Sequence, residues 1–209
     1  KKYDAYVVTD EVYEHIVYAP NKHIYMQSLE GMRERTIVCN SLSKTYSITG
    51  WRLGYVIANP QIIDRVKKVH DFLTVGAAAP LMEAAVVGLE FGDGYYDELA
   101  AHYAHMKEVF VGGLKKLGLK YTDPQGAYYV LVDVSEFGVK DDVKFCEWMA
   151  QFVGVAAVPG SSFFREDVHN LVRFHFAKQD DTLNEAIKRL ATLKAVSYTH
   201  LTLPTTSRV

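Results

Sequence analysis

Residues 41–44 read Ser-Leu-Ser-Lys, and Arg52 follows in the run Gly-Trp-Arg-Leu-Gly-Tyr of residues 50–55. A lysine amine can form a Schiff base with a carbonyl compound. An arginine fork and neighbouring hydroxyl groups can bind a phosphate. The spacing therefore predicts a site for a ligand that carries both a carbonyl and a phosphate. The alternative is an ordinary surface lysine, because Ser-x-Ser-Lys is common and lone lysines are usually solvated.

A second segment, residues 5–13, reads Ala-Tyr-Val-Val-Thr-Asp-Glu-Val-Tyr. Its apolar residues 6–8 predict a short buried strand that ends near Asp10. Ligands bind at this edge of open α/β sheets. There Asp10 can pair with a protonated pyridine nitrogen, and Tyr13 can donate a hydrogen bond to a phenolic oxygen. Pyridoxal 5'-phosphate (PLP) carries these groups on one ring. The alternative is a helix N-cap aspartate beside a packing tyrosine.

Arg173 stands in a third informative segment, the apolar residues 171–176. Strand alternation places Arg173 on the face opposite Phe174. A half-buried guanidinium needs an anionic partner. A carboxylate ligand bound by two parallel hydrogen bonds would supply it. A salt bridge to Glu166 or Asp167 is the alternative.

Together these segments resemble the class I and II aminotransferase family, whose members are PLP-dependent enzymes of fold type I. The resemblance covers residues 3–194 approximately and follows the family's order: Asp10-x-x-Tyr13, Ser41-x-Ser43-Lys44, residues 50–55 and residues 171–177. It implies an α/β fold. We expect the C-terminal part of a fold-type I large domain, with a mainly parallel sheet and flanking helices, followed by a smaller α/β C-terminal domain.

The resemblance implies a role for each matching residue. Lys44 is the implied Schiff-base lysine. Asp10 is the implied partner of the pyridine nitrogen, and Tyr13 that of the phenolic oxygen, so these three are the expected catalytic residues. Ser41 and Arg52 are the implied phosphate ligands, which completes the expected cofactor site.

The implied activity is transfer of an amino group between an L-amino acid and a 2-oxo acid, with Arg173 binding the substrate's α-carboxylate. Residues 69–75 contain no arginine for a side-chain carboxylate. This favours neutral, sulfur-containing or aromatic amino acids, and the stretch is similar to glutamine/kynurenine- and methionine-type aminotransferases. Two alternatives stay open: a PLP-dependent carbon–sulfur β-lyase and a non-enzymatic PLP-binding regulator. Members of the family are usually homodimers.

Composition narrows the class of protein. The chain has 209 residues, a formal net charge of −2 and 49% hydrophobic residues. That is enough for a sizeable core, and it gives no reason to expect a nucleic-acid or membrane partner. Two cysteines form no disulfide framework, which favours the cytoplasm. The histidines lack ligand spacing, and no metal site is expected.

The expected organisation has three parts. Residues 1–92 would be the remainder of the large PLP-binding domain, residues 93–194 the small C-terminal domain, and residues 195–209 a foreign or disordered tail. Because the family carries a long N-terminal part before the Asp-x-x-Tyr segment, we expect the chain to be the C-terminal portion of a larger enzyme. Periodicity and turn residues predict strands and helices. The expected strands are residues 6–8, 36–41, 53–58, 128–134, 155–159 and 171–177. The expected helices are residues 60–73, 80–91, 95–117, 141–152 and 180–194.

Overall fold

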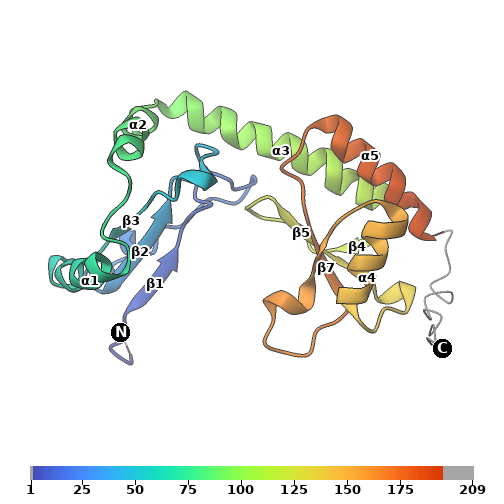
Figure 1. Ribbon diagram of the computed structural model, residues 1–209, viewed down its shortest axis with the longest axis horizontal. Coiled ribbons are helices and arrows are strands. Elements are labelled where there is room, and N and C mark those ends of the chain that lie inside the picture. Colours follow the sequence, from blue (N-terminus) through green and yellow to red (C-terminus); the bar gives the residue numbers. More distant parts are fainter. Residues whose placement is uncertain (1, 195–209) are drawn as a thin grey trace, which may run out of the picture. The chain divides into compact units, whose positions relative to one another are not determined.

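The computed structural model describes residues 2–194, and the chain divides into two compact units between Ala101 and His102 (Figure 1). Unit 1 holds the residues up to Ala101, and unit 2 holds the residues from His102 onward. The division falls within helix α3 (Asp93–Lys116), whose start lies next to the boundary expected at residue 92. The expected tail, residues 195–209, lies outside the described residues.

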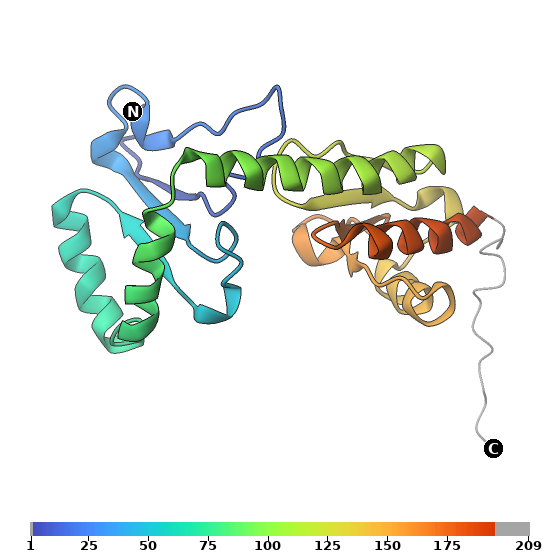
Figure 2. The ribbon, with the colours of Figure 1, turned by 90° about the horizontal axis from the view of Figure 1, so that it is seen from above.

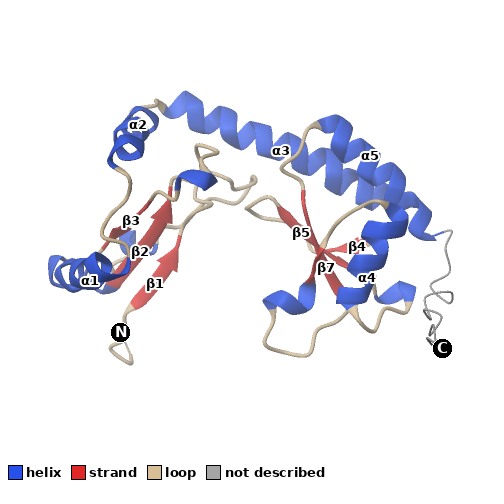
Figure 3. Cartoon of the chain, in the orientation of Figure 1, coloured by secondary structure: helices blue, strands red, loops and turns tan. Residues whose placement is uncertain are grey.

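Unit 1 contains a three-stranded sheet in the order β1 (Val7–Asp10), β2 (Thr36–Ser41) and β3 (Gly54–Ile57) (Figure 3). Strands β1 and β2 are parallel, and β2 and β3 are antiparallel. The prediction for β2 is confirmed at both ends. The prediction of a buried strand at residues 6–8 is wrong in its bounds and in its burial.

The exposed fractions show the reason for that error. Tyr6 is 65% exposed and Val8 is 67% exposed, while Val38 of β2 is 2% exposed. Strands β1 and β3 are the two edges of this sheet, and only β2 has a neighbour on each side. An apolar run therefore correctly indicates a strand, but burial depends on what covers the strand.

The helices of unit 1 follow the turn residues. Helix α1 (Pro60–Leu73) begins where expected, because Pro60 suits the first helical position and the Asn59 side chain accepts a hydrogen bond of 2.9 Å from the Gln61 amide. Helix α2 (Ala79–Leu89) ends two residues earlier than expected. Within residues 2–194, no helix combines the length and the apolar character needed to cross a lipid bilayer.

Unit 2 contains a four-stranded antiparallel sheet in the order β4, β5, β7, β6. The bounds are Lys120–Tyr121 for β4, Tyr129–Asp133 for β5, Val158–Pro159 for β6 and Leu171–His175 for β7. Strand β4 was not predicted, and β6 is shorter than the expected residues 155–159. In β7 the predicted alternation is confirmed, because Val172 and Phe174 are buried while Arg173 is only partly covered.

The helices of unit 2 are α4, α5 and the part of α3 from His102 onward. Helix α4 (Asp142–Trp148) continues into a π-helical turn (Met149–Val153), and α5 (Asp180–Leu190) continues into a 3-10 turn (Ala191–Lys194). Helices α3 and α5 run side by side (Figure 2). The rings of Phe110 in α3 and Phe174 in β7 lie 5.8 Å apart, which places α3 against the buried face of the sheet. Shorter 3-10 turns occupy residues 26–28, 33–35, 49–51, 135–137 and 160–163.

Two adjacent glycines of α3 provide a test of the α3–α5 packing. A Cβ atom added at Gly113 would meet Ile187 of α5 at 2.5 Å, whereas one added at Gly112 would meet nothing within 4 Å. We expect Gly113→Ala to lower the free energy of unfolding by about 1–3 kcal/mol through overpacking. Gly112→Ala should raise it by about 0.5–1 kcal/mol, because alanine favours helix. Urea unfolding measures both, and equal effects would contradict this packing.

Candidate active site

Asp10 and Ser41 lie at the same edge of the unit 1 sheet, because each is the last residue of its strand. Strands β1 and β2 are parallel, and Asp10 is in register with Cys39, two residues before Ser41. Residues 8–10 and 39–41 line a shared hollow of about 390 Å³. Ligands bind at this edge in open α/β sheets. The structure thus brings together two of the predicted site residues.

The hydroxyl group of Ser41 is surrounded by partners from the loop that follows β2. Its Oγ lies 2.6 Å from the Oγ of Ser43 and 3.0 Å from the carbonyl oxygen of Leu53, and it accepts a hydrogen bond of 3.1 Å from the Ser43 amide. A hydroxyl carries one proton, so Ser41 can give it to one of these acceptors or to an incoming anion.

Lys44 is half-buried on the turn that follows Ser43. The Tyr46 amide donates to the Leu42 carbonyl at 3.2 Å, which closes the turn around Lys44. The carbonyl of Thr45, the residue after Lys44, accepts a hydrogen bond of 2.7 Å from the hydroxyl of Tyr95 in α3. These two hydrogen bonds fix the backbone of the turn and so the position of Lys44. A side chain that bonds covalently to a ligand needs such a fixed position.

Arg52 has an unusual backbone conformation. Its φ and ψ angles of 58° and 41° are left-handed, a region that costs energy for a residue with a Cβ atom. Its Nη1 donates to the Thr49 carbonyl at 3.1 Å. Gly54, two residues later, pairs with Ser41, so Arg52 and Ser41 lie at the same edge of the sheet. Such strain in a local turn is typical of functional sites.

Tyr13 is half-buried in the turn after β1, where its carbonyl accepts a hydrogen bond of 2.9 Å from the Ile16 amide. Residues 12–15 form turns and no helix begins there. The alternative interpretation of Asp10 as a helix N-cap is therefore wrong. Instead, Oδ1 of Asp10 accepts a hydrogen bond of 3.3 Å from the Val12 amide, which fixes the side chain beside its own strand end.

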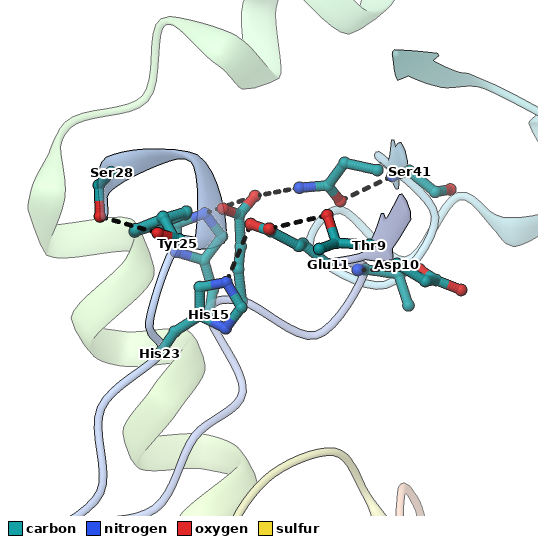
Figure 4. Close-up of polar contacts among 11 residues, drawn as sticks. Thr9, Asp10, Glu11, His15, His23, Tyr25, Ser28 and Ser41 are labelled. Atoms are coloured by element: carbon teal, nitrogen blue, oxygen red, sulfur yellow. Dashed lines mark hydrogen bonds and ion pairs between the residues drawn. The ribbon is translucent and has the colours of Figure 1, made fainter. Parts of the chain in front are cut away.

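A buried polar cluster lies next to Asp10 (Figure 4). Glu11 is only 5% exposed, and its carboxylate accepts a hydrogen bond of 2.9 Å from the Thr9 hydroxyl. The other oxygen of Glu11 lies 3.0 Å from Nε2 of His23. A buried carboxylate is stable only when it is paired in this way, so His23 fixes the residue that follows Asp10.

A second chain of hydrogen bonds leads to Ser41. The side-chain amide of Asn40 donates to the carboxylate of Glu14 at 2.7 Å, and its oxygen accepts from the Ser41 amide at 2.7 Å. Glu11, His23, Glu14 and Asn40 were not among the residues predicted for the site. The available signal for Asn40 was an amide directly after the apolar residues 37–39 of the predicted strand.

Burial shifts the pKa of three ring side chains of this region toward their neutral forms. Burial, followed by the charge of Glu14, raises the pKa of Tyr25 to about 12. Burial, followed by the hydrogen bond to Tyr96, raises the pKa of Tyr46. Burial lowers the pKa of His15, despite the nearby Glu14, and its ring stacks on Tyr96 at 4.3 Å. These shifts favour the neutral forms of all three side chains.

Arg173 lies in unit 2, on β7. Its guanidinium carbon is 3.7 Å from the ring centre of Phe163 and 4.2 Å from that of Tyr129. Its Nε atom is buried without a hydrogen-bond partner. Among the residues the structure describes, no carboxylate forms an ion pair with Arg173, so the predicted alternative of a salt bridge to Glu166 or Asp167 is wrong.

Arg173 also borders a hollow of about 250 Å³, which it lines together with Tyr128, Tyr129, Val158 and His175. A buried guanidinium nitrogen that lacks a partner is costly unless a ligand supplies one. The arrangement can therefore bind an anion of carboxylate size.

The family model described as aminotransferase class I and II matches residues 1–190. The chain belongs to the class I and II aminotransferase family. The methionine aminotransferase of Escherichia coli (strain K12) is 36% identical over 192 residues, which cover 91% of this chain and 50% of that protein. The aspartate aminotransferase of Pyrococcus horikoshii is 34% identical over 191 residues, which cover 90% of this chain and 48% of that protein. The chain spans about half the length of the curated relatives it matches.

Solved aminotransferase structures share the fold. The N-succinyldiaminopimelate aminotransferase of Mycobacterium tuberculosis matches with a TM-score of 0.85 and 35% identity, over 90% of this chain and 50% of that one. The aromatic aminotransferase of Pyrococcus horikoshii matches with a TM-score of 0.86 and 33% identity, over 93% of this chain and 52% of that one. The expected fold type I architecture is thereby confirmed.

Aminotransferases of this family depend on PLP, and the residues of unit 1 fit that cofactor. Lys44 offers an amine for its aldehyde and Asp10 a carboxylate for its ring nitrogen, while Ser41 and Arg52 offer a hydroxyl and a guanidinium for its phosphate. These residues fit PLP by position as well as by residue type. Asp10, Ser41 and Arg52 lie at one sheet edge, and Lys44 lies on the turn between Ser41 and Arg52. Tyr13 follows Asp10 by three residues.

The left-handed backbone of Arg52 can be tested by a pair of substitutions. Arg52→Gly and Arg52→Ala both remove the guanidinium, but only glycine relieves the left-handed conformation. We expect the glycine variant to be more stable than the alanine variant by about 1 kcal/mol. Urea unfolding of the two variants measures the difference. An alanine variant as stable as the glycine variant would show that this turn is unstrained.

Proposed function

We propose that the protein is a PLP-dependent aminotransferase that moves an amino group between an L-amino acid and a 2-oxo acid. The observation that carries this proposal is the convergence of a carboxylate, a hydroxyl and a strained arginine at one sheet edge, with Lys44 on the intervening turn. PLP, when bound, supplies an electron sink for the bond that breaks at the substrate's Cα atom.

The chain's own residues would bind and orient the reactants. Lys44 would hold the aldehyde carbon and then move the proton of the substrate's Cα atom. Asp10 would keep a proton on the ring nitrogen, and Tyr13 would donate to the phenolic oxygen. Arg173 would bind the α-carboxylate, because its Nε–H has no partner among the described residues and two rings orient its plane.

The role of Lys44 has a direct test in the full-length protein. Lys44→Ala should lower kcat below detection, because no other group can both hold the cofactor and move the proton. Borohydride reduction followed by peptide mapping should place the PLP adduct on Lys44 in the wild type. Lys67→Ala, at an exposed lysine of α1, is the control and should keep full activity. Substantial transamination by Lys44→Ala, or an adduct on a different lysine, would sink the assignment.

We propose that the preferred substrates are neutral, sulfur-containing or aromatic amino acids. The support comes from this chain: residues 69–75, at the end of α1 and beyond it, hold exposed apolar side chains and no arginine. Val69, Phe72 and Val75 are 59%, 94% and 84% exposed. An apolar surface without a guanidinium offers nothing to a side-chain carboxylate.

This substrate preference predicts a ratio of rates. With 2-oxoglutarate as acceptor, kcat/KM for L-methionine should exceed that for L-aspartate by about tenfold or more, because a buried carboxylate without a partner weakens transition-state binding. Coupled assays of both amino acids measure the ratio. Equal values would contradict the preference but leave transamination intact. Pyruvate and ammonia released from cystathionine without an acceptor would instead identify a β-lyase.

We further propose a homodimer in the cytoplasm. Neither Cys39 nor Cys146 forms a disulfide, which fits a reducing compartment. The exposed apolar side chains of α1 form the kind of surface that another subunit covers.

A further inference from the structure

Two aromatic rings contact the guanidinium of Arg173. The ring centres of Phe163 and Tyr129 lie 3.7 and 4.2 Å from its central carbon, so the guanidinium packs over both ring faces. Tyr129 belongs to the neighbouring strand β5, but Phe163 comes from residues 160–170, the loop between β6 and β7. The orientation of Arg173 therefore depends on where this loop holds Phe163.

A single buried carboxylate anchors that loop at both ends. Asp142, at the first turn of α4, is 0% exposed. Its Oδ2 accepts a hydrogen bond of 2.7 Å from the amide of Ser161, two residues before Phe163. Its Oδ1 lies 3.1 Å from Nδ1 of His169, four residues before Arg173.

The charges of this anchor are consistent with an ion pair. The hydrogen bond to Asp142, followed by that to Asp167, raises the pKa of His169. Burial raises the pKa of Asp142, but hydrogen bonds from Ser161 and His169 outweigh it, and the pKa is lowered overall. Burial, followed by the negative charge of Asp142, raises the pKa of the Cys146 thiol to about 12. Asp142 is thus an anion, and His169 is its cation at mildly acidic pH.

We propose that Asp142 is a positioning residue for substrate binding: with His169 it anchors residues 160–170 so that Phe163 holds Arg173 ready for the substrate's α-carboxylate. The inference rests on the proposed function, in which Arg173 binds that carboxylate. It deepens the proposal, because it adds a residue that touches neither the substrate nor the cofactor. His169 bridges two carboxylates, Asp142 of α4 and Asp167 of its own loop, at 3.1 and 2.8 Å.

The anchor should depend on pH. A protonated His169 donates to both carboxylates, whereas the neutral ring has one N–H and can donate to only one. The pKa of His169 is raised above its ordinary value of 6.5. Below pH 6.5 the protonated ring therefore bonds to both carboxylates, and one of these hydrogen bonds is lost as the pH rises through the raised pKa. The KM of both substrates should rise over the same pH range.

Adjacent aspartates provide a matched pair for the test in the full-length protein. Asp141→Asn and Asp142→Asn make the same change at the N-cap and at the first residue of α4. Asp141 caps the helix by accepting a hydrogen bond of 3.1 Å from the Lys144 amide, and asparagine caps equally well; the exposed ion pair of Asp141 with the Lys144 side chain, at 3.5 Å, contributes little. We expect Asp142→Asn to raise KM for the amino acid and for the 2-oxo acid by about tenfold, with kcat within about threefold, because both substrates carry the α-carboxylate. Asp141→Asn should leave both constants unchanged. An unchanged KM in Asp142→Asn would overturn the proposal.

A second pair of variants keeps the test valid if Asp142→Asn fails to fold. Phe163 is 45% exposed, so Phe163→Leu should fold while losing the ring face that stacks on Arg173. It should raise KM for both substrates as Asp142→Asn does, and Phe163→Tyr should restore it. A Phe163→Leu variant with wild-type KM would contradict the stacking role.

A readout independent of activity separates this inference from the proposed function. In protein labelled with ¹⁵N-arginine, the Nε–H resonance of Arg173 is identified by its loss in Arg173→Lys. We expect this resonance to move in both Asp142→Asn and Phe163→Leu, and to stay in place in Asp141→Asn. If the protein catalyses no amino transfer, the proposed function fails, and this resonance still decides whether Asp142 positions Arg173. A resonance that does not respond to Asp142→Asn would refute the anchor.

Discussion

The parallel pairing of β1 with β2 is the constraint on which the rest of the site depends. It places the carboxyl ends of both strands at one edge, so that Asp10 and Ser41, 31 residues apart in the sequence, line one hollow. The antiparallel return of β3 then brings Arg52 to the same edge. No single contact could do this, because Asp10, Ser41 and Arg52 come from three separate segments. A shift of one residue in the β1–β2 register would turn Asp10 to the opposite face of the sheet.

The sequence predicted this edge well because its signals are local. Each signal occupies only a few adjacent residues: an apolar run, a polar residue at its end, and a turn. Strand β2 and helix α1 accordingly have the predicted bounds. The missed features depend on partners far away in the chain. Strand β4 has only two residues and exists because β5 pairs with it. Glu11 is buried because His23, twelve residues later, returns to pair with it. Neither partner can be read from a local pattern.

Arg173 shows the same limit within one site. Alternation along β7 correctly predicted a half-covered arginine opposite a buried apolar face. It could not predict what covers the guanidinium, because Phe163 arrives from a loop whose path is fixed by Asp142 on another helix. A salt bridge to Glu166 or Asp167 was the predicted alternative for this arginine. In the structure Asp167 pairs with His169 instead, and the guanidinium packs over two rings and has no carboxylate partner among the described residues.

Several features of both units lower the stability of the protein, and the fold does not require them. Arg52 adopts a left-handed backbone, Glu11 and Asp142 are buried carboxylates, and the Nε atom of Arg173 is buried without a partner. Apolar residues could replace the buried ion pairs with little loss of stability. Such costs persist where geometry matters more than stability, since a precisely held charge binds a ligand better than a mobile one. The costs in unit 1 gather around the sheet edge that holds Asp10 and Ser41, and those in unit 2 around Arg173. On the roles proposed for these residues, cofactor retention and carboxylate binding should respond to different sets of substitutions, one in each unit.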